Sequence, residues 1–248
     1  MVDVTFLRRT MRGAANLALS TFWPPTCVLC GGRGSAPAQD LCGACEADLP
    51  VNSVACAVCA EPLAAAIDGH LRCGLCLKRA PRFDAAVAAY RYAYPIDHLV
   101  RALKYQSAIV QARVLGDLLA NRVRTGRSEF PGLLIPVPLA PQRFRSRGYN
   151  QALELARRLE MQLRIPMRAD LIMRTRETVE QVGLGQKERR RNIRNAFAIT
   201  GPLPAHHIAI VDDVITTGST ANELARVLKR AGAKRVEVWA VARAGSDA

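Results

Sequence analysis

The chain has 248 residues, of which 50% are hydrophobic and 23% are charged. This composition excludes a disordered chain, and the length allows one or two globular domains with a buried core. No apolar run approaches the roughly 18 residues that a membrane-spanning helix needs, so the sequence predicts a cytoplasmic protein with no transmembrane segment.

The formal net charge of +14 is unevenly distributed. Residues 1–80 carry 7 basic and 6 acidic side chains, whereas residues 81–248 carry 28 basic and 15 acidic side chains. Such an excess favours polyanionic ligands such as nucleic acid, polyphosphates or an anionic surface. A proteome rich in arginine would produce the same excess, so the charge alone does not identify a ligand.

Residues 1–25 are expected to form a short amphipathic helix. The stretch LRRTMRGAANLALSTFWPP at 7–25 places basic residues before a short apolar run. The small-residue cleavage pattern of a secretory signal peptide does not follow it. We expect this helix to pack on the protein, and a helix lying on a membrane surface is the alternative.

Residues 26–80 contain all eight cysteines, arranged as four CxxC pairs. Two intervening residues let a tight turn present both sulfurs to one ion, and tetrahedral Zn²⁺ takes four thiolates at about 2.3 Å. Disulfides would need an oxidising compartment, and a redox CxxC would not repeat four times. The spacing therefore predicts a double zinc ribbon with two structural Zn²⁺ sites. A crossed pairing of the CxxC motifs also fits. The simplest pairing is sequential, with one site made of Cys27, Cys30, Cys42 and Cys45 and the other of Cys56, Cys59, Cys73 and Cys76.

Residues 81–248 are predicted to form an α/β domain. Apolar periodicity predicts helices at 94–106, 109–126, 150–163 and 219–233, and strands at 83–92, 132–139, 170–175, 195–200, 206–211 and 235–243. This alternation predicts a mostly parallel sheet with flanking helices and with ligands at the carboxyl ends of the strands. The segment 175–194 has no clear pattern and is typical of a polar insertion that moves over a site.

The stretch IVDDVITTGST, residues 210–220, is the most informative in the chain. We expect its strand to end at Val211 and a helix to begin near Thr220. Backbone N–H groups, hydroxyls and the helix dipole in the intervening loop favour a phosphate. Asp212 and Asp213 would repel that phosphate unless they bind sugar hydroxyls or help to hold Mg²⁺. A ribose with a 5′-phosphate satisfies both requirements.

This stretch resembles the phosphoribosyl pyrophosphate (PRPP) signature of type I phosphoribosyltransferases, in which two acids precede a threonine-threonine-glycine-x-threonine loop. The resemblance implies that Asp212 and Asp213 bind the ribose hydroxyls and that Mg²⁺ accompanies PRPP. It also implies that the 5′-phosphate is wrapped by Thr216, Thr217, Gly218, Ser219 and Thr220.

The wider chain resembles the ComF family of competence-related proteins. The similarity rests on IPVPLAPQRFRSRGYNQA (135–152), RTRETVEQVGLGQKERRRNIRNAF (174–197) and the upstream double zinc ribbon, and it covers nearly all of residues 23–243. It implies a PRPP-binding protein linked to DNA uptake, with single-stranded DNA and competence-machinery proteins as partners. The alternative is an active transferase whose nitrogen acceptor the sequence does not identify.

Two basic segments complete the predicted site. In phosphoribosyltransferases a loop after an earlier strand grips the pyrophosphate, and our candidates there are Ser146, Arg147 and Gly148. Arg143 and Arg145 in the same stretch are candidates for a nucleic-acid contact or a flexible loop, and a solvated basic loop is the alternative. The second segment matches the family's flexible segment, which closes over bound PRPP. It would equally suit a nucleic-acid backbone or a solvated charge run: Lys187, Arg189, Arg190, Arg191 and Arg194.

Overall fold

A computed structural model describes residues 25–35, 40–64, 72–105, 109–125, 127–176 and 191–245. The helix expected at residues 1–25 lies almost entirely outside this part, as do Lys187, Arg189 and Arg190. The chain divides into two compact units, Met1–Leu49 and Pro50–Ala248. The division falls inside the segment 26–80 that the sequence predicts as one domain, so the last two CxxC pairs share a unit with the α/β fold.

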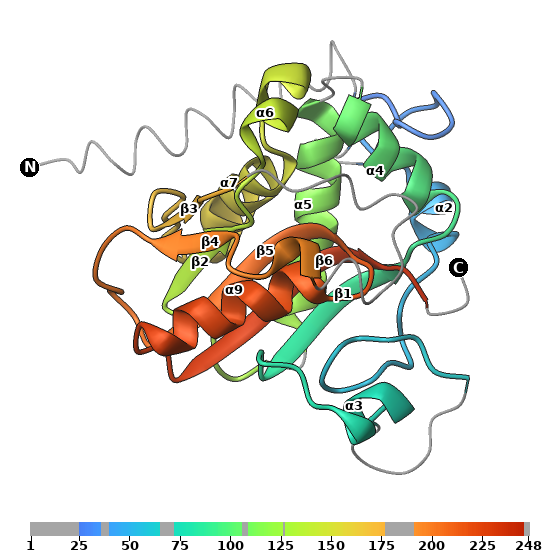
Figure 1. The fold of residues 1–248 in the computed structure, drawn as a ribbon. Helices are drawn as coiled ribbons and strands as arrows, with labels where there is room; N and C mark the ends of the chain where they lie inside the picture. Colours follow the sequence, from blue (N-terminus) through green and yellow to red (C-terminus); the bar gives the residue numbers. More distant parts are fainter. Residues whose placement is uncertain are drawn as a thin grey trace, which may run out of the picture. The chain divides into compact units, whose positions relative to one another are not determined.

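The second unit is built on a four-stranded sheet in the order β1 (Ala85–Arg91), β6 (Arg235–Arg243), β5 (His207–Ile215), β2 (Leu133–Pro136). Every neighbouring pair is parallel, so the carboxyl ends of the four strands meet at one edge (Figure 1). The predicted fold class, a mostly parallel sheet with flanking helices, is confirmed. The central strands β5 and β6 are almost wholly buried, as expected when helices cover both faces of a sheet.

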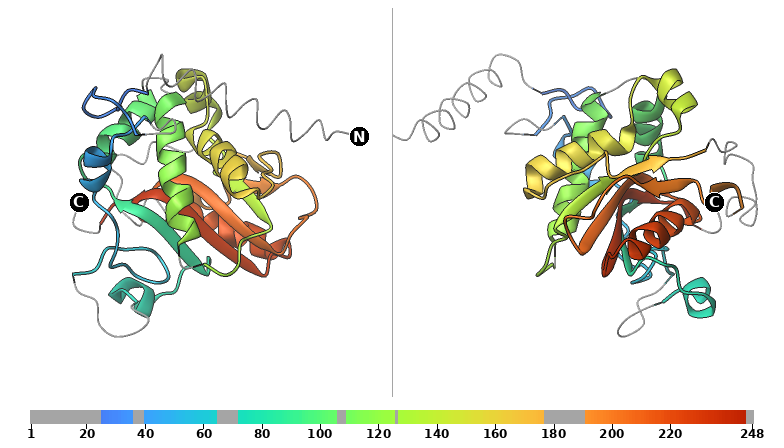
Figure 2. Two further views of the ribbon diagram at one scale, coloured as in Figure 1. Left: turned by 180° about the vertical axis from the view of Figure 1, so that it is seen from behind. Right: turned by 60° about the vertical axis from the view of Figure 1, so that its left-hand side comes forward.

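Three helices precede or follow β2: α4 (Ile96–Tyr105), α5 (Ile109–Arg124) and α7 (Gln151–Leu163). Helices α5 and α7 pack on the same face of the sheet, and α4 packs on α5 (Figure 2). In α4 the apolar residues recur every three or four positions, so that Leu99 and Leu103 lie buried on one side. The three helices lie close to their predicted bounds.

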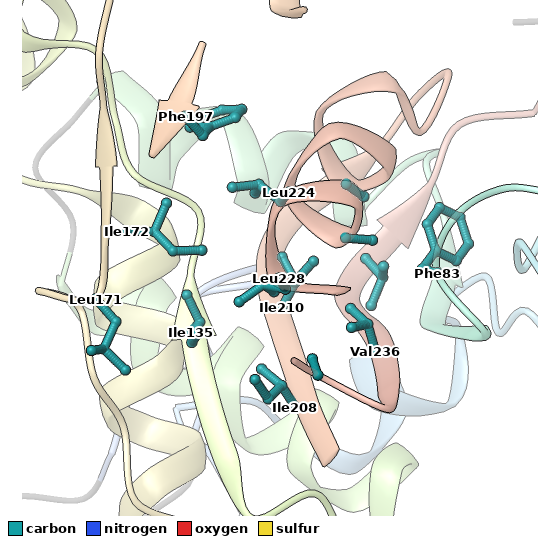
Figure 3. Packing of buried hydrophobic residues seen from close by; sticks show 14 of the residues in the cluster. Phe83, Ile135, Leu171, Ile172, Phe197, Ile208, Ile210, Leu224, Leu228 and Val236 are labelled. Atoms are coloured by element: carbon teal, nitrogen blue, oxygen red, sulfur yellow. The ribbon is translucent and has the colours of Figure 1, made fainter. Parts of the chain in front are cut away.

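The opposite face is covered by α9 (Ser219–Arg230) and by an antiparallel pair, β3 (Ile172–Arg174) and β4 (Phe197–Ile199). Figure 3 shows Leu224 and Leu228 of α9 packed between the sheet and this pair. Burying each such leucine contributes about 1.5–3 kcal/mol. The loop between β5 and α9 is therefore anchored at both of its ends.

Two local predictions are wrong. Strand β5 does not end at Val211 but continues to Ile215, because β6 extends to Arg243 and keeps offering hydrogen-bond partners as far as that residue. The basic stretch after β2 is not an open loop but a short helix, α6 (Pro141–Arg147). It begins with proline and ends at Gly148, whose φ of 78° is the left-handed conformation that terminates helices.

The cysteine segments contribute two single-turn helices, α2 (Gly43–Ala47) and α3 (Gly74–Lys78), each of which begins inside a CxxC pair. None of the helices in the described ranges is long and apolar enough to cross a membrane.

Candidate functional site

A cavity of about 290 Å³ lies at the carboxyl edge of the sheet. Asp212 and Asp213 at the end of β5 line it, together with the whole loop 216–220. Side chains from four other parts of the second unit complete the wall: Tyr92, Lys104, Tyr105, Arg143, Arg147 and Arg174. The cavity therefore joins the predicted ribose and phosphate residues to a group of cationic side chains.

The loop 216–220 has the geometry of an anion site. Gly218 is the N-cap of α9, and its φ of 68° lies in the left-handed region that strongly favours glycine. The hydroxyls of Thr217 and Ser219 are 2.9 Å apart, and the Ser219 N–H donates to the Thr217 hydroxyl at 3.4 Å. The first N–H groups of a helix lack intrahelical acceptors, so the start of α9 presents donors and a positive dipole end to this loop.

The two aspartates differ in their contacts. Asp213 is only 7% exposed. Its Oδ1 accepts the Val214 N–H at 2.9 Å, and its Oδ2 lies 2.7 Å from Nζ of Lys104. Asp212 Oδ1 accepts the N–H of Asp213 at 2.9 Å. Lys104 thus compensates one negative charge of the acidic pair.

Burial and the adjacent charge of Asp213 raise the pKa of Asp212 well above its usual range. Burial opposes ionisation of Asp213 as well, but the attraction of Lys104 outweighs it and lowers the pKa of Asp213. The pair consequently holds a charged Asp213 beside an Asp212 that retains a proton readily. A ligand that donates hydrogen bonds to both carboxylates, such as a sugar diol, would favour loss of that proton.

Helix α6 brings only some of its predicted residues to the cavity. Arg143 and Arg147, four residues apart, share one side of the helix and line the cavity. Arg145 instead lines a separate hollow beside Phe144. Neither Ser146 nor Gly148 lines the cavity; the Ser146 hydroxyl donates to the carbonyl of Arg143 at 3.1 Å, and Gly148 caps the helix.

Several cavity residues are absent from the predicted site, among them Lys104, Tyr105 and Arg174. Lys104 and Tyr105 come from the end of α4, and Arg174 comes from β3. The guanidinium of Arg147 lies over the Tyr105 ring, 5.2 Å from its centre. Burial, followed by the nearby charges of Arg143 and Arg176, lowers the pKa of the Arg174 guanidinium. The stretch LKYQ at 103–106 follows the pattern of the ComF family, but it does not assign a role to Lys104 or Tyr105, because these residues reach the cavity only through the packing of distant segments.

The second basic segment is described only from residue 191 onward. Arg191 and Arg194 are exposed and do not line the cavity. Their carbonyls, with that of Asn192, accept hydrogen bonds from the guanidinium of Arg176. The Asn195 N–H donates to Glu223 of α9 at 2.7 Å. The segment that precedes β4 is therefore fixed to α9 at its carboxyl end.

The eight cysteines form two clusters in the sequential pairing: Cys27, Cys30, Cys42 and Cys45, then Cys56, Cys59, Cys73 and Cys76. We call these the first and second clusters. In each, the sulfurs all lie within 4.8 Å of one another. The first cluster belongs to the unit Met1–Leu49 and the second to the unit Pro50–Ala248.

The donor sets fit zinc. Thiolates bound tetrahedrally at about 2.3 Å are about 3.8 Å apart. The Sγ atoms of Cys30 and Cys42 are 3.8 Å apart, and those of Cys59 and Cys73 are 3.6 Å apart. Backbone N–H groups also point at the sulfurs, as in Cys73 N–H to Cys56 Sγ at 3.3 Å. Both clusters therefore support closed, structural zinc sites, because four thiolates leave no open coordination position.

A larger cavity, about 460 Å³, lies at the opposite, amino edge of the sheet. Its acid Glu237 is fully buried and is paired with Arg127, Arg235 and His207. This cavity contains neither the acidic pair nor the loop 216–220. The smaller cavity is therefore the candidate site.

Comparison with known proteins supports a double zinc ribbon followed by a phosphoribosyltransferase-type domain. The family model "Double zinc ribbon domain" matches residues 18–77, and the model "Phosphoribosyl transferase domain" matches residues 145–248. A purine phosphoribosyltransferase structure from Pyrococcus horikoshii overlaps 52% of this chain and 70% of its own, at 22% identity and a TM-score of 0.32. That overlap is too slight to carry weight beside the family models.

Two curated relatives cover most of the chain. Competence protein F of Haemophilus influenzae is 35% identical over 91% of this chain and 100% of its own length. DNA utilization protein YhgH of Escherichia coli O157:H7 is 36% identical over 89% of this chain and 97% of its own. With zinc-type cysteine clusters preceding a phosphoribosyltransferase-type domain, the chain belongs to the ComF family.

Proposed function

We propose that the cavity at the carboxyl edge of the sheet binds PRPP together with Mg²⁺. The observation that carries the proposal is the shared wall formed by the acidic pair and the loop 216–220. A phosphate loop alone would suit many anions. A phosphate loop beside Asp212 and Asp213 selects an anion that also carries hydroxyl groups.

Each part of PRPP has a counterpart in the cavity. The 5′-phosphate would accept hydrogen bonds from the loop 216–220 and the start of α9. The ribose hydroxyls would donate to Asp212 and Asp213, which also provide oxygen ligands, direct or through water, for Mg²⁺. Arg143 and Arg147 line the same cavity. They would meet the pyrophosphate, because a guanidinium can bind two phosphate oxygens at once.

We further propose that PRPP binding serves a role in DNA utilization. Two curated relatives carry the names competence protein and DNA utilization protein. The net charge of +14 favours a polyanionic partner such as single-stranded DNA. Exposed Arg191 and Arg194 belong to the basic segment that would contact the DNA backbone. Proteins of the competence machinery are the expected protein partners.

The alternative is catalysis on the same ligand. A phosphoribosyltransferase would displace pyrophosphate from C1 of PRPP with a nitrogen nucleophile, which becomes bonded to C1. Arg143 and Arg147 would stabilise the charge of the departing pyrophosphate, and excluding water from the cavity would favour the nitrogen nucleophile. Release of pyrophosphate in the presence of a nitrogen acceptor, lost in Asp213→Asn, would establish this activity.

The deciding experiment is a calorimetric titration of the zinc-loaded protein with PRPP and Mg²⁺. We expect a dissociation constant on the order of 1 μM, about −8 kcal/mol, that is lost in the double variant Asp212→Asn, Asp213→Asn. Asp170→Asn is the matched control, because Asp170 is exposed, pairs with Arg168 and lies outside the cavity. A folded wild-type protein that binds no PRPP would contradict the proposal.

The DNA role has its own test. We expect single-stranded DNA to bind with a steep salt dependence, and each lost phosphate contact to reduce the slope of log K against log salt by about 0.7. Neutralising Arg189, Arg190 and Arg191 to glutamine should lower the slope. Neutralising three exposed arginines outside the basic segment, Arg157 on α7 with Arg164 and Arg168 after it, should lower it less. Equal slopes for the two variants would contradict a specific role for this segment.

A further inference from the structure

The last residue of β6, Arg243, is a buried cation that touches two functional features of the second unit. It is 7% exposed. Its guanidinium donates on one side to backbone carbonyls at the start of the phosphate loop and on the other side to the second cysteine cluster. A buried guanidinium needs such partners, since an uncompensated buried charge is strongly destabilising.

On the loop side, Nη1 of Arg243 donates to the carbonyl of Ile215 at 3.1 Å and to the carbonyl of Thr216. The Thr216 carbonyl shares a planar trans peptide with the N–H of Thr217, so the two groups point in opposite directions. Holding this carbonyl toward Arg243 therefore points the Thr217 N–H away from Arg243. Thr217 lines the cavity, so Arg243 sets the orientation of the first peptide of the loop.

On the cluster side, Nε of Arg243 donates to the carbonyl of Cys59 at 3.2 Å, and its Nη2 pairs with the carboxylate of Glu61. Glu61 is bound to the same knuckle, because its carbonyl accepts the Cys56 N–H at 2.8 Å. The Ala60 N–H also donates to the carbonyl of Cys56 at 2.9 Å. The partners that hold Arg243 are thus part of the turn that carries two of the four sulfurs.

A second contact joins the same regions through apolar packing. Cys59 packs against the core cluster that contains Phe83 and Ile215. The Phe83 ring lies 3.8 Å from the position that a Cβ on Gly218 would occupy. The knuckle therefore adjoins the phosphate loop both through Arg243 and through the core beneath Gly218.

We infer that the second cysteine cluster is a positioning element for the phosphate loop, and that zinc binding there raises the affinity of the cavity for a 5′-phosphate. Few large apolar residues surround the cluster, so metal ligation supplies much of the order of the Cys56–Glu61 turn. The ordered turn fixes Glu61 and the Cys59 carbonyl, and both of these bind the guanidinium of Arg243. Arg243 in turn fixes the orientation of the Thr216 carbonyl. The PRPP part of this inference rests on the proposed function.

The test compares the matched second knuckles of the two clusters in the full-length protein. The variant Cys73→Ser, Cys76→Ser empties the second cluster without altering the contacts of Arg243, and Cys42→Ser, Cys45→Ser empties the first. Two quantities are measured: PRPP affinity by calorimetry, and hydrogen exchange of a peptide covering residues 214–221. Emptying the second cluster should weaken PRPP binding by about tenfold, within the usual range of coupling between sites, and should accelerate exchange in the loop. Emptying the first should change neither.

If the second-cluster variant fails to fold, the variants Glu61→Gln and Arg243→Lys test the coupling between the second cluster and the phosphate loop, because they keep all eight cysteines. Both should loosen the loop while zinc stays bound. Equal affinity and equal loop exchange with the second cluster emptied would overturn the inference and leave the PRPP site intact. Absence of PRPP binding in the wild type would instead overturn the proposed function. In that case, hydrogen exchange of residues 214–221 with and without zinc would by itself test whether the second cluster positions the loop.

Discussion

Two segments that line the cavity, the loop after β5 and helix α6 after β2, are built in opposite ways. The loop after β5 is fixed from behind by Arg243, by the Phe83 ring beneath Gly218 and by the Lys104 pair. The segment after β2 forms α6, which buries none of its residues and offers Arg143 and Arg147 as partly exposed side chains. One half of the site is therefore preorganised, whereas the other half has to order long side chains when a ligand binds.

The largest expected effect concerns the buried pair on the β5 side. Lys104→Met should destabilise the protein by about 3 kcal/mol at neutral pH, because it leaves the charge of Asp213 buried and unpaired. Lys229→Met is the matched control, since the Lys229–Asp84 pair is about one-third exposed on each side and contributes about 1 kcal/mol or less. Chemical denaturation measures both variants, and equal losses would contradict the preorganised picture.

The same pair predicts a pH dependence of that loss. The lowered folded-state pKa of Asp213 means that its stabilising effect is present above the ordinary carboxyl pKa of 3.8 and is lost as the pH falls through the folded-state pKa. Without Lys104, burial raises the pKa of Asp213, so the difference in unfolding free energy between wild type and Lys104→Met should be largest above that raised pKa. It should shrink as the pH falls from there toward the lowered pKa of the wild type. A difference that grows on acidification would contradict the assignment of Lys104 as the partner of Asp213.

Two left-handed glycines, Gly218 in the loop after β5 and Gly148 at the end of α6, sharpen the comparison of the two segments. Gly218→Ala and Gly148→Ala meet no steric clash, so each should lose about 1–2 kcal/mol of stability from the backbone conformation alone. Only Gly218 lines the cavity. We therefore expect PRPP affinity to fall about tenfold in Gly218→Ala and to stay within about threefold in Gly148→Ala, as measured by calorimetry.

The acidic pair should also make ligand binding depend on pH. Because burial and Asp213 raise the pKa of Asp212, binding of a sugar diol releases a proton, so PRPP affinity should rise with pH below that raised pKa by up to about tenfold per unit. Asp212→Asn should remove this component and leave only the titration of the phosphates of PRPP. If the PRPP affinities of wild type and Asp212→Asn changed in parallel with pH, Asp212 would not be the group that releases the proton.

These differences explain which parts of the site the sequence predicts. The acidic pair and the loop 216–220 form one continuous motif, because one strand end and one helix start supply every group. Lys104, Arg174 and Arg243 come from three other segments, and only the packing of α4, β3 and β6 places them. Arg243 finds its partner Thr216 at 27 positions along the chain, and Lys104 finds Asp213 at 109 positions, separations that local sequence patterns do not encode.

The errors in the fold have the same origin. The sequence predicted that β5 ends where its apolar run ends, at Val211, but the length of a strand depends on its neighbour. Because β6 continues to Arg243, its pairing with β5 extends past Asp212 and Asp213 as far as Ile215. Likewise, the arginines of α6 gave no apolar periodicity, because a helix without buried residues lacks that pattern. Alternating strands and helices nevertheless sufficed to predict the sheet.

The smallest expected effect lies on α6 itself. Arg147 and Arg145 are two positions apart in helix α6, yet only Arg147 lines the cavity, where it also stacks on Tyr105. Because its side chain is partly exposed and screened, Arg147→Gln should weaken PRPP binding by less than about 1 kcal/mol, a loss that added salt diminishes. Arg145→Gln should leave the affinity unchanged at every salt concentration. If calorimetry instead gave Arg147→Gln a larger, salt-independent loss than Gly218→Ala, α6 would be the rigid half of the site, and the comparison would be reversed.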